Sequence, residues 1–217
     1  MRLRPALFVP LLILALGLAI APARALQGED PAALITNLVT EAIANIKDAQ
    51  SDANREAKFR TLLETGFDIP RISRFVMGRY WNGANDQERQ RFSSLFEDWI
   101  VRTYAARFRQ YGGQTLKVNG TRSESEISTV VMSQFINPDG APPAKVEWRV
   151  RKDANGSFKV VDVSVEGISM ALTQRDEIAA VADRSGGTVE GLNQALAQRI
   201  QSGEATPGAL PQTKSGG

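Results

Sequence analysis

The chain has 217 residues, with 26 lysines and arginines, 24 aspartates and glutamates, and neither histidine nor cysteine. Without histidine it lacks the usual general base and the Ser-His-Asp triad. Without cysteine it has no thiol nucleophile and no sulfur ligands for a metal. Carboxylate or lysine chemistry remains possible for an enzyme, but no spacing of these residues points to it. We therefore expect no catalytic residues, no metal site and no cofactor.

The first 25 residues have the pattern of a cleaved export signal. Arg2 and Arg4 precede an apolar stretch over 6–20, and residues 23–25 form a small-x-small cleavage site. An uncleaved anchor fits less well, because the stretch is short for a membrane-spanning helix. We expect a mature protein in a bacterial periplasm. Cleavage removes three arginines and no acid, so the net charge changes from +2 to −1, which argues against a nucleic-acid partner.

The first half of the mature chain has the apolar periodicity of helices. Asp30 and Pro31 have the residue types of an N-cap and a first helical position. Asn85 and Glu88, three residues apart, resemble a capping box before a long helix with an aromatic inner face. The predicted helices are residues 31–46, 59–66, 68–80 (broken at 81–83) and 86–111.

The second half begins with the alternating pattern of β-strands. In the stretch 145–152, Val146, Trp148 and Val150 alternate with charged residues, which predicts a strand with one buried face. Asn155-Gly156 then provides a turn to a valine-rich strand, so the two form an antiparallel hairpin. The predicted strands are residues 114–121, 126–137, 145–152 and 158–165.

Two further helices, at 170–184 and 189–201, close a single domain over 26–202, and the Pro/Gly/Ser-rich residues 203–217 form a disordered tail. The predicted class is α+β, with an antiparallel sheet of about four strands covered on one face by about six helices. Residue types alone are compatible either with a solid core between sheet and helices or with a cavity there.

Several segments together carry a resemblance to a known family. They are NPDGAPP at 137–143, KVEWRVRK at 145–152, FKVVDVSVEGISM at 158–170, FVMGRYW at 75–81 and TYAARFRQYGG at 103–113. Spanning roughly 67–192, this pattern resembles the MlaC, or toluene-tolerance (Ttg2-type), family of periplasmic phospholipid-binding proteins.

The resemblance implies a carrier and not an enzyme. It would enclose the tails of one phospholipid in an apolar pocket between sheet and helices. It would move lipid between an outer-membrane lipoprotein complex (MlaA-like) and an inner-membrane ABC transporter (with an MlaD-like subunit), and we expect it to be a monomer. By position against the family pattern, the expected lipid-binding residues are Phe75, Phe96, Ile100, Tyr104, Val146, Trp148, Val150, Val163, Ile168 and Met170.

Other interpretations stay open at this point. Each of the ten residues also fits ordinary core packing, which would make the chain an interaction protein with a filled core. The ligand of a carrier could instead be a hopanoid, a rigid sterol-like lipid. A small cone-shaped α+β enzyme would need an acid in its pocket, for which Asp162 is the best placed. Its alternation with Val161 and Val163 indicates that it faces away.

Overall fold

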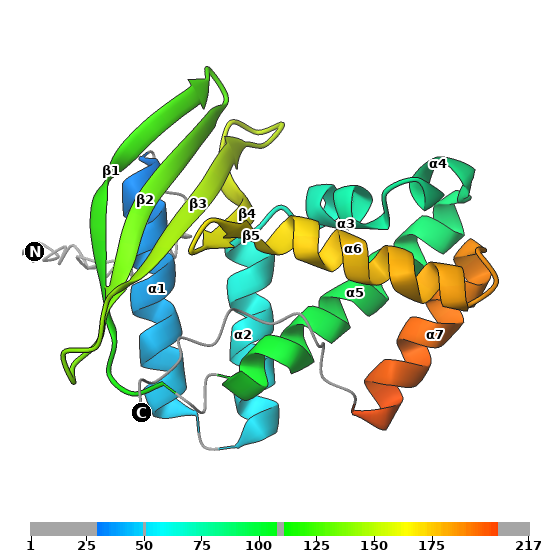
Figure 1. Cartoon of the computed structure of the whole chain (residues 1–217), viewed down its shortest axis with the longest axis horizontal. Coiled ribbons are helices and arrows are strands. Elements are labelled where there is room, and N and C mark those ends of the chain that lie inside the picture. Colours follow the sequence, from blue (N-terminus) through cyan, green and yellow to red (C-terminus); the bar gives the residue numbers. More distant parts are fainter. Residues whose placement is uncertain (1–29, 50, 108–110, 204–217) are drawn as a thin grey trace, which may run out of the picture.

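The computed structural model describes residues 30–49, 51–107 and 111–203. The predicted export signal lies outside these residues, as does the predicted tail beyond Gly203. Within them the chain is α+β, as predicted, with seven helices and one five-stranded antiparallel sheet (Figure 1). The fifth strand is only two residues long. The elements are α1 (Pro31–Asp48), α2 (Asp52–Gly66), α3 (Ile69–Met77), α4 (Tyr80–Gly83), α5 (Asp86–Arg107), β1 (Thr115–Ser125), β2 (Ser128–Ile136), β3 (Ala144–Lys152), β4 (Phe158–Val165), β5 (Ile168–Ser169), α6 (Met170–Arg184) and α7 (Val189–Ser202).

Helix starts are fixed by the predicted local hydrogen bonds. The Asp30 carboxylate accepts from the backbone N–H of Ala33 at 3.1 Å, so Asp30 is the N-cap of α1. The capping box before α5 is confirmed. The backbone N–H of Glu88 donates to Asn85 Oδ1, and that of Asn85 donates to Glu88 Oε2, both at 2.9 Å.

Three predicted boundaries differ from the structure. The second helix begins at Asp52 and not near Phe59, because the Ser51 hydroxyl caps it by accepting from the Asn54 N–H at 3.1 Å. The third helix ends at Met77, because Gly78 takes a positive φ of 57° that stops it, and the expected break at 81–83 is part of the single-turn helix α4. The first strand continues to Ser125, and Glu126 lies in the tight turn to β2. Pairing with β2 holds this polar end of β1 extended, although its residues lack apolar alternation.

The sheet is a meander in the order β1-β2-β3-β4-β5. As predicted, Val146, Trp148 and Val150 share one buried face, and Trp148 stands opposite Val131 on β2 and Val163 on β4. We call this the inner face. The β1–β2 ladder is interrupted by register shifts between Val118 and Gly120 and between Ser123 and Ser125. Beyond β5, the edge of β4 is covered by the α2–α3 connection, where the Asp68 N–H donates to the Val160 carbonyl at 3.0 Å.

Most of the buried apolar residues form two clusters that share no member. The sheet-side cluster joins the inner face to α1 and α2, and the helix-side cluster joins α3, α5, α6 and α7, which Figure 1 shows beside the sheet. The predicted helical layer over the sheet is thus divided: α1 and α2 pack on the inner face, whereas α3, α5, α6 and α7 pack mainly on one another. The sheet-side cluster is Leu34, Ile35, Leu38, Val39, Leu62, Val131, Val146, Trp148, Val150 and Val160, and the helix-side cluster is Val76, Met77, Ala84, Phe92, Phe96, Trp99, Ile178, Val181, Ala182, Val189, Leu192, Leu196 and Ile200.

Among the described residues, no helix combines the length and the apolar character needed to cross a membrane.

Candidate functional site

Four of the ten predicted lipid-binding residues lie on the inner face of the sheet. Val146, Trp148 and Val150 are buried in the sheet-side cluster, and Val163 is half-buried against it. The Trp148 indole N–H donates to Ser133 Oγ at 2.9 Å, and the Ser133 hydroxyl donates to the carbonyl of Val146 at 2.9 Å. Since this buried polar pair is satisfied within the sheet, Trp148 leaves only its apolar ring for packing or for a ligand.

Two more predicted residues belong to the helical half. Phe96 is buried in the helix-side cluster and stacks on Phe92, with ring centroids 5.9 Å apart and planes at 11°. Ile100, about one turn further along α5, is half-buried and packs against the same cluster. The part of the aromatic face that carries Phe92 and Phe96 therefore lies in the helix-side cluster, to which α3, α6 and α7 also contribute.

The remaining four predicted residues belong to neither cluster. Tyr104 on α5 and Met170 at the start of α6 are half-buried, whereas Phe75 and Ile168 are 39% and 49% exposed. The structure thus brings six of the ten residues into two separate apolar clusters and does not bring all ten into one cavity.

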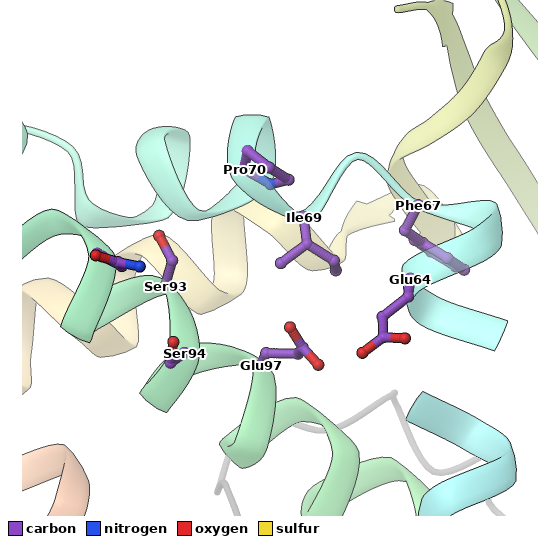
Figure 2. Close-up of a pocket in the computed structure, with 8 residues that line it drawn as sticks. Glu64, Phe67, Ile69, Pro70, Ser93, Ser94 and Glu97 are labelled. Carbon is purple, nitrogen blue, oxygen red and sulfur yellow. The ribbon is translucent and has the colours of Figure 1, made fainter. Parts of the chain in front are cut away.

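A cavity of about 310 Å³ lies between the C-terminal end of α2, the start of α3 and α5 (Figure 2). Phe67 lines the cavity and packs against the sheet-side cluster. The opposite wall of the cavity is formed by α5, the helix that carries Phe92 and Phe96. The cavity therefore adjoins the sheet-side cluster, and its α5 wall is on the helix that also contributes to the helix-side cluster. Its lining is Glu64, Phe67, Ile69, Pro70, Gln90, Ser93, Ser94 and Glu97.

The cavity has an apolar wall and a polar rim. Figure 2 shows Ile69 extending from the start of α3 toward α5, and the Glu97 side chain rising toward it. Glu97 Oε1 accepts from Arg60 Nη1 at 2.6 Å, and Arg60 Nη2 donates to Asp98 Oδ1 at 2.6 Å, so this arginine ties α2 to α5 beside the cavity. Such a mixture suits an amphiphilic ligand. Sequence reasoning missed these residues, because they come from three elements with no local motif.

Asp162 is part of the scaffold. It stands opposite Arg149 in the register and therefore faces away from the inner face, as its alternation indicates. Its Oδ1 accepts from the backbone N–H of Ala171 at 3.0 Å, and its Oδ2 accepts from Ser169 Oγ at 2.7 Å. Asp162 thus fixes the N-terminus of α6 to β4 and does not line the cavity.

Arg149, on the outer face of the sheet, is engaged by acids of the same chain. Its Nε donates to Glu124 Oε2 at 3.0 Å, and its Nη1 lies 3.5 Å from Asp162 Oδ2. The hydrogen bond from Arg149 lowers the pKa of Glu124. This guanidinium is therefore occupied within the sheet.

Two polar residues of α6 were not predicted as part of any site. Gln174 is buried, and within the described part of the chain both its amide atoms lack a hydrogen-bond partner, as does Oε2 of half-buried Glu177. Burial raises the pKa of Glu177 to about 7, and the charge of Arg199 opposes this rise. Gln174 and Glu177 lie three residues apart on a helix face that is otherwise apolar, and this spacing is the sequence signal from which they could have been predicted.

Comparisons with known proteins agree with this architecture. A family model described as "MlaC protein" matches residues 35–198. The toluene tolerance protein ttg2D of Pseudomonas putida is 24% identical over 200 residues, which is 88% of this chain and 92% of that protein. The intermembrane phospholipid transport system binding protein MlaC of Haemophilus influenzae is 24% identical over 97 residues, 44% of this chain and 45% of that protein.

A solved structure has a similar fold. It is the phospholipid-binding protein of Ralstonia solanacearum in complex with a phospholipid, with a TM-score of 0.69 and 27% sequence identity, covering 80% of this chain and 98% of that one.

Proposed function

Because the chain belongs to the MlaC family, we propose that it is a periplasmic phospholipid-binding carrier that takes one lipid between its sheet and its helices. The observation that carries this proposal is the similarity of fold to a protein whose structure was solved with a phospholipid bound, which covers 80% of this chain and 98% of that protein. The division of the apolar core into two clusters with no common residue supports it, since each cluster offers a separate wall to an apolar ligand. On this proposal the chain acts by binding, and no residue has a catalytic role.

The tails determine what the protein must do physically. Burying a methylene contributes roughly 0.8 kcal/mol, so two tails of about fifteen methylenes favour burial by on the order of 20 kcal/mol. The cavity of about 310 Å³ is at the low end of the roughly 300–1,000 Å³ usual for small-molecule sites. A bound lipid would therefore separate the sheet-side cluster from the helix-side cluster and enlarge this cavity.

The residues that would line the enlarged site come from both walls. Val163 of the inner face and Ile100 of α5 are half-buried members of the predicted set, one on each side. The buried members behind them, Val146, Trp148, Val150 and Phe96, would support these walls. Phe75 and Ile168 lie at the surface, outside this arrangement.

We further infer the route that the family system implies. The export signal over 1–25 would be removed, and the mature protein would receive and deliver phospholipid at two membrane assemblies. One is an inner-membrane ABC transporter with an MlaD-like subunit, and the other is an outer-membrane lipoprotein complex with an MlaA-like component. The name of the Haemophilus relative, an intermembrane phospholipid transport binding protein, supports this role.

Native mass spectrometry tests the proposal directly. The mature protein is purified from its own periplasm without detergent, and its bound lipid is extracted. We expect an adduct of phospholipid mass at one per chain. An adduct of triterpenoid mass would show that the ligand is of the hopanoid type and not a phospholipid. A mass of protein alone, both as purified and after incubation with phospholipid vesicles, would overturn the carrier function.

Charged variants test the placement of the lipid. Ile100→Glu and Val163→Glu put a carboxylate on either wall, and because both side chains are half-buried the protein should still fold. We expect the phospholipid adduct to decrease at least tenfold in each. Ile127→Glu, in the exposed turn between β1 and β2, is the matched control and should retain its lipid. Equal lipid content in all three variants would contradict the placement.

A further inference from the structure

Three of the four large apolar side chains that stand exposed in the described residues gather on adjoining elements. They are Phe75 of α3 (39% exposed), Ile168 of β5 (49%) and Leu172 of α6 (53%), and the fourth, Ile127, is in the β1–β2 turn. Figure 1 shows α3 and β5 next to α6, and α3 packs on α6. Grouped exposure of this kind, in contrast to single apolar residues, is typical of an interaction surface.

Arg175 joins the members of this group. Its guanidinium lies over the Phe75 ring, 5.1 Å from the centroid. Its Nε lies 3.2 Å from the position that a Cβ on Gly78 would take. Leu172 precedes Arg175 by three residues, so both lie on the same side of α6, and Ile168 lies in β5, directly before the N-cap Ser169. Phe75, Leu172 and Arg175 therefore form one surface, which we call the α3–α6 patch, and Ile168 lies near its edge.

The charges of the patch are open to a partner. Within the described residues neither Arg175 nor exposed Arg74, next to Phe75, forms an ion pair. One exposed acid, Asp176, adjoins them on α6. The neighbouring Arg71 and Arg79 are already paired with Asp68 and Asp183. Around Phe75, Leu172 and Arg175 the patch thus presents an apolar centre with a net positive border, and the exposed acid Glu166 lies outside it, near Ile168.

We propose that the α3–α6 patch is the docking face of this carrier for a partner protein whose surface pairs an apolar patch with carboxylates. This rests on the proposed carrier function, which requires contact with assemblies at two membranes. Stacked aromatic and arginine side chains are enriched at the centres of protein interfaces. A bare membrane fits less well, because lipid-binding surfaces use clusters of about 4–8 lysines and arginines, whereas two unpaired arginines beside an acid are present here.

The α3–α6 patch also lies apart from the residues proposed to contact lipid tails. Its apolar members belong to neither buried cluster, and none lines the cavity. Changing them should therefore alter docking while lipid binding and folding remain intact. This separation is what distinguishes the patch from an outer part of the lipid site.

Binding to a transporter subunit tests the proposal. The probe is the purified periplasmic part of the MlaD-like subunit from the same organism, and the lipid-loaded carrier is measured against it by biolayer interferometry. We expect Leu172→Ser and Arg175→Gln each to weaken the affinity about tenfold or more. Ile127→Ser, at another exposed apolar residue outside the patch, should bind as the wild type does. Higher salt should weaken the wild type more than Arg175→Gln.

Three results would overturn the docking face. One is wild-type affinity in both patch variants, and another is no binding of the probe by the wild type. The third is a loss in the patch variants of vesicle binding or of self-association instead, measured with phosphatidylglycerol-containing vesicles and by light scattering. Lipid content of every variant is measured in parallel by native mass spectrometry. Absence of lipid in the wild type would refute the carrier function, whereas full lipid content with unchanged docking would refute only the patch.

Discussion

Replacing Asp162 by asparagine tests whether this acid holds α6 to the sheet. The residue is 8% exposed, and its two carboxylate oxygens accept from the N–H of Ala171 and from the hydroxyl of Ser169. Asparagine has nearly the same size. It keeps one acceptor and turns the other into a donor that faces the Ser169 hydroxyl. The substitution therefore changes charge and hydrogen bonding with little change in packing.

The expected loss follows from these contacts. A hydrogen bond to a charged group contributes about 1.5–3 kcal/mol. Asparagine retains a neutral bond to Ala171, loses the charge-assisted bond from Ser169, and leaves Arg149 with Glu124 as its partner. We expect a decrease of about 2 kcal/mol in the free energy of unfolding. Since domains of this kind have about 5–15 kcal/mol in total, the variant should remain folded.

Urea unfolding followed by tryptophan fluorescence measures this difference. The control is Asp176→Asn, at an exposed acid on α6. Its free energy of unfolding should stay within about 0.5 kcal/mol of the wild-type value. The structural role of Asp162 is refuted if Asp162→Asn is as stable as the control. A variant of normal stability that had lost its lipid would equally contradict it, because the acid would then serve the site.

Three other substitutions follow from local features. Ser133→Ala leaves the buried Trp148 indole N–H without its acceptor and should cost about 1–3 kcal/mol in urea unfolding; adding Trp148→Phe should cost less than the sum of the two single changes. Burial raises the pKa of Glu177 from 4.5 to about 7, so the folded state holds more protons than the unfolded state between these values, and stability falls as pH rises through them. Glu177→Gln should abolish this fall and gain about 1 kcal/mol at pH 8 after solvent screening, and a pH slope equal to that of the wild type would contradict it. A Cβ on Gly191 would lie 2.1 Å from a backbone carbonyl oxygen, so Gly191→Ala should lower the melting temperature by several degrees despite alanine's helix propensity, whereas Gly83→Ala, in open space, should not.

Much of the fold was predictable because its causes are local. Asp30 caps α1 through its own carboxylate, and the alternation around Trp148 is visible in the residue types. In β4, however, strict alternation places Val160 on the outer face with Asp162. A register shift opposite Arg149 and Val150 lets Val160 join the inner face together with Val163. A bulge of this kind depends on pairing with the next strand, so a period of two cannot reveal it.

The site was less predictable, because apolar type does not distinguish a buried wall from an exposed face. Ile168 and Phe75 have the residue types of the interior, yet both lie at the surface. The cavity is defined by where α2, α3 and α5 meet, and Glu64 and Ser93 reach it from positions 29 residues apart. Only the packing of whole helices brings such residues together.

The two register shifts in β1 have a consequence for how this protein behaves in a crowded compartment. The outer edge of β1 has no neighbouring strand in the sheet, and such an edge can pair with another chain and begin aggregation. The shifts divide the ladder into runs of four residues, Thr115 to Val118 and Gly120 to Ser123, shorter than the usual strand of about 5–6. A second chain would find no long regular stretch to extend. The irregularities of β1 thus help to keep the molecule from polymerising through its sheet.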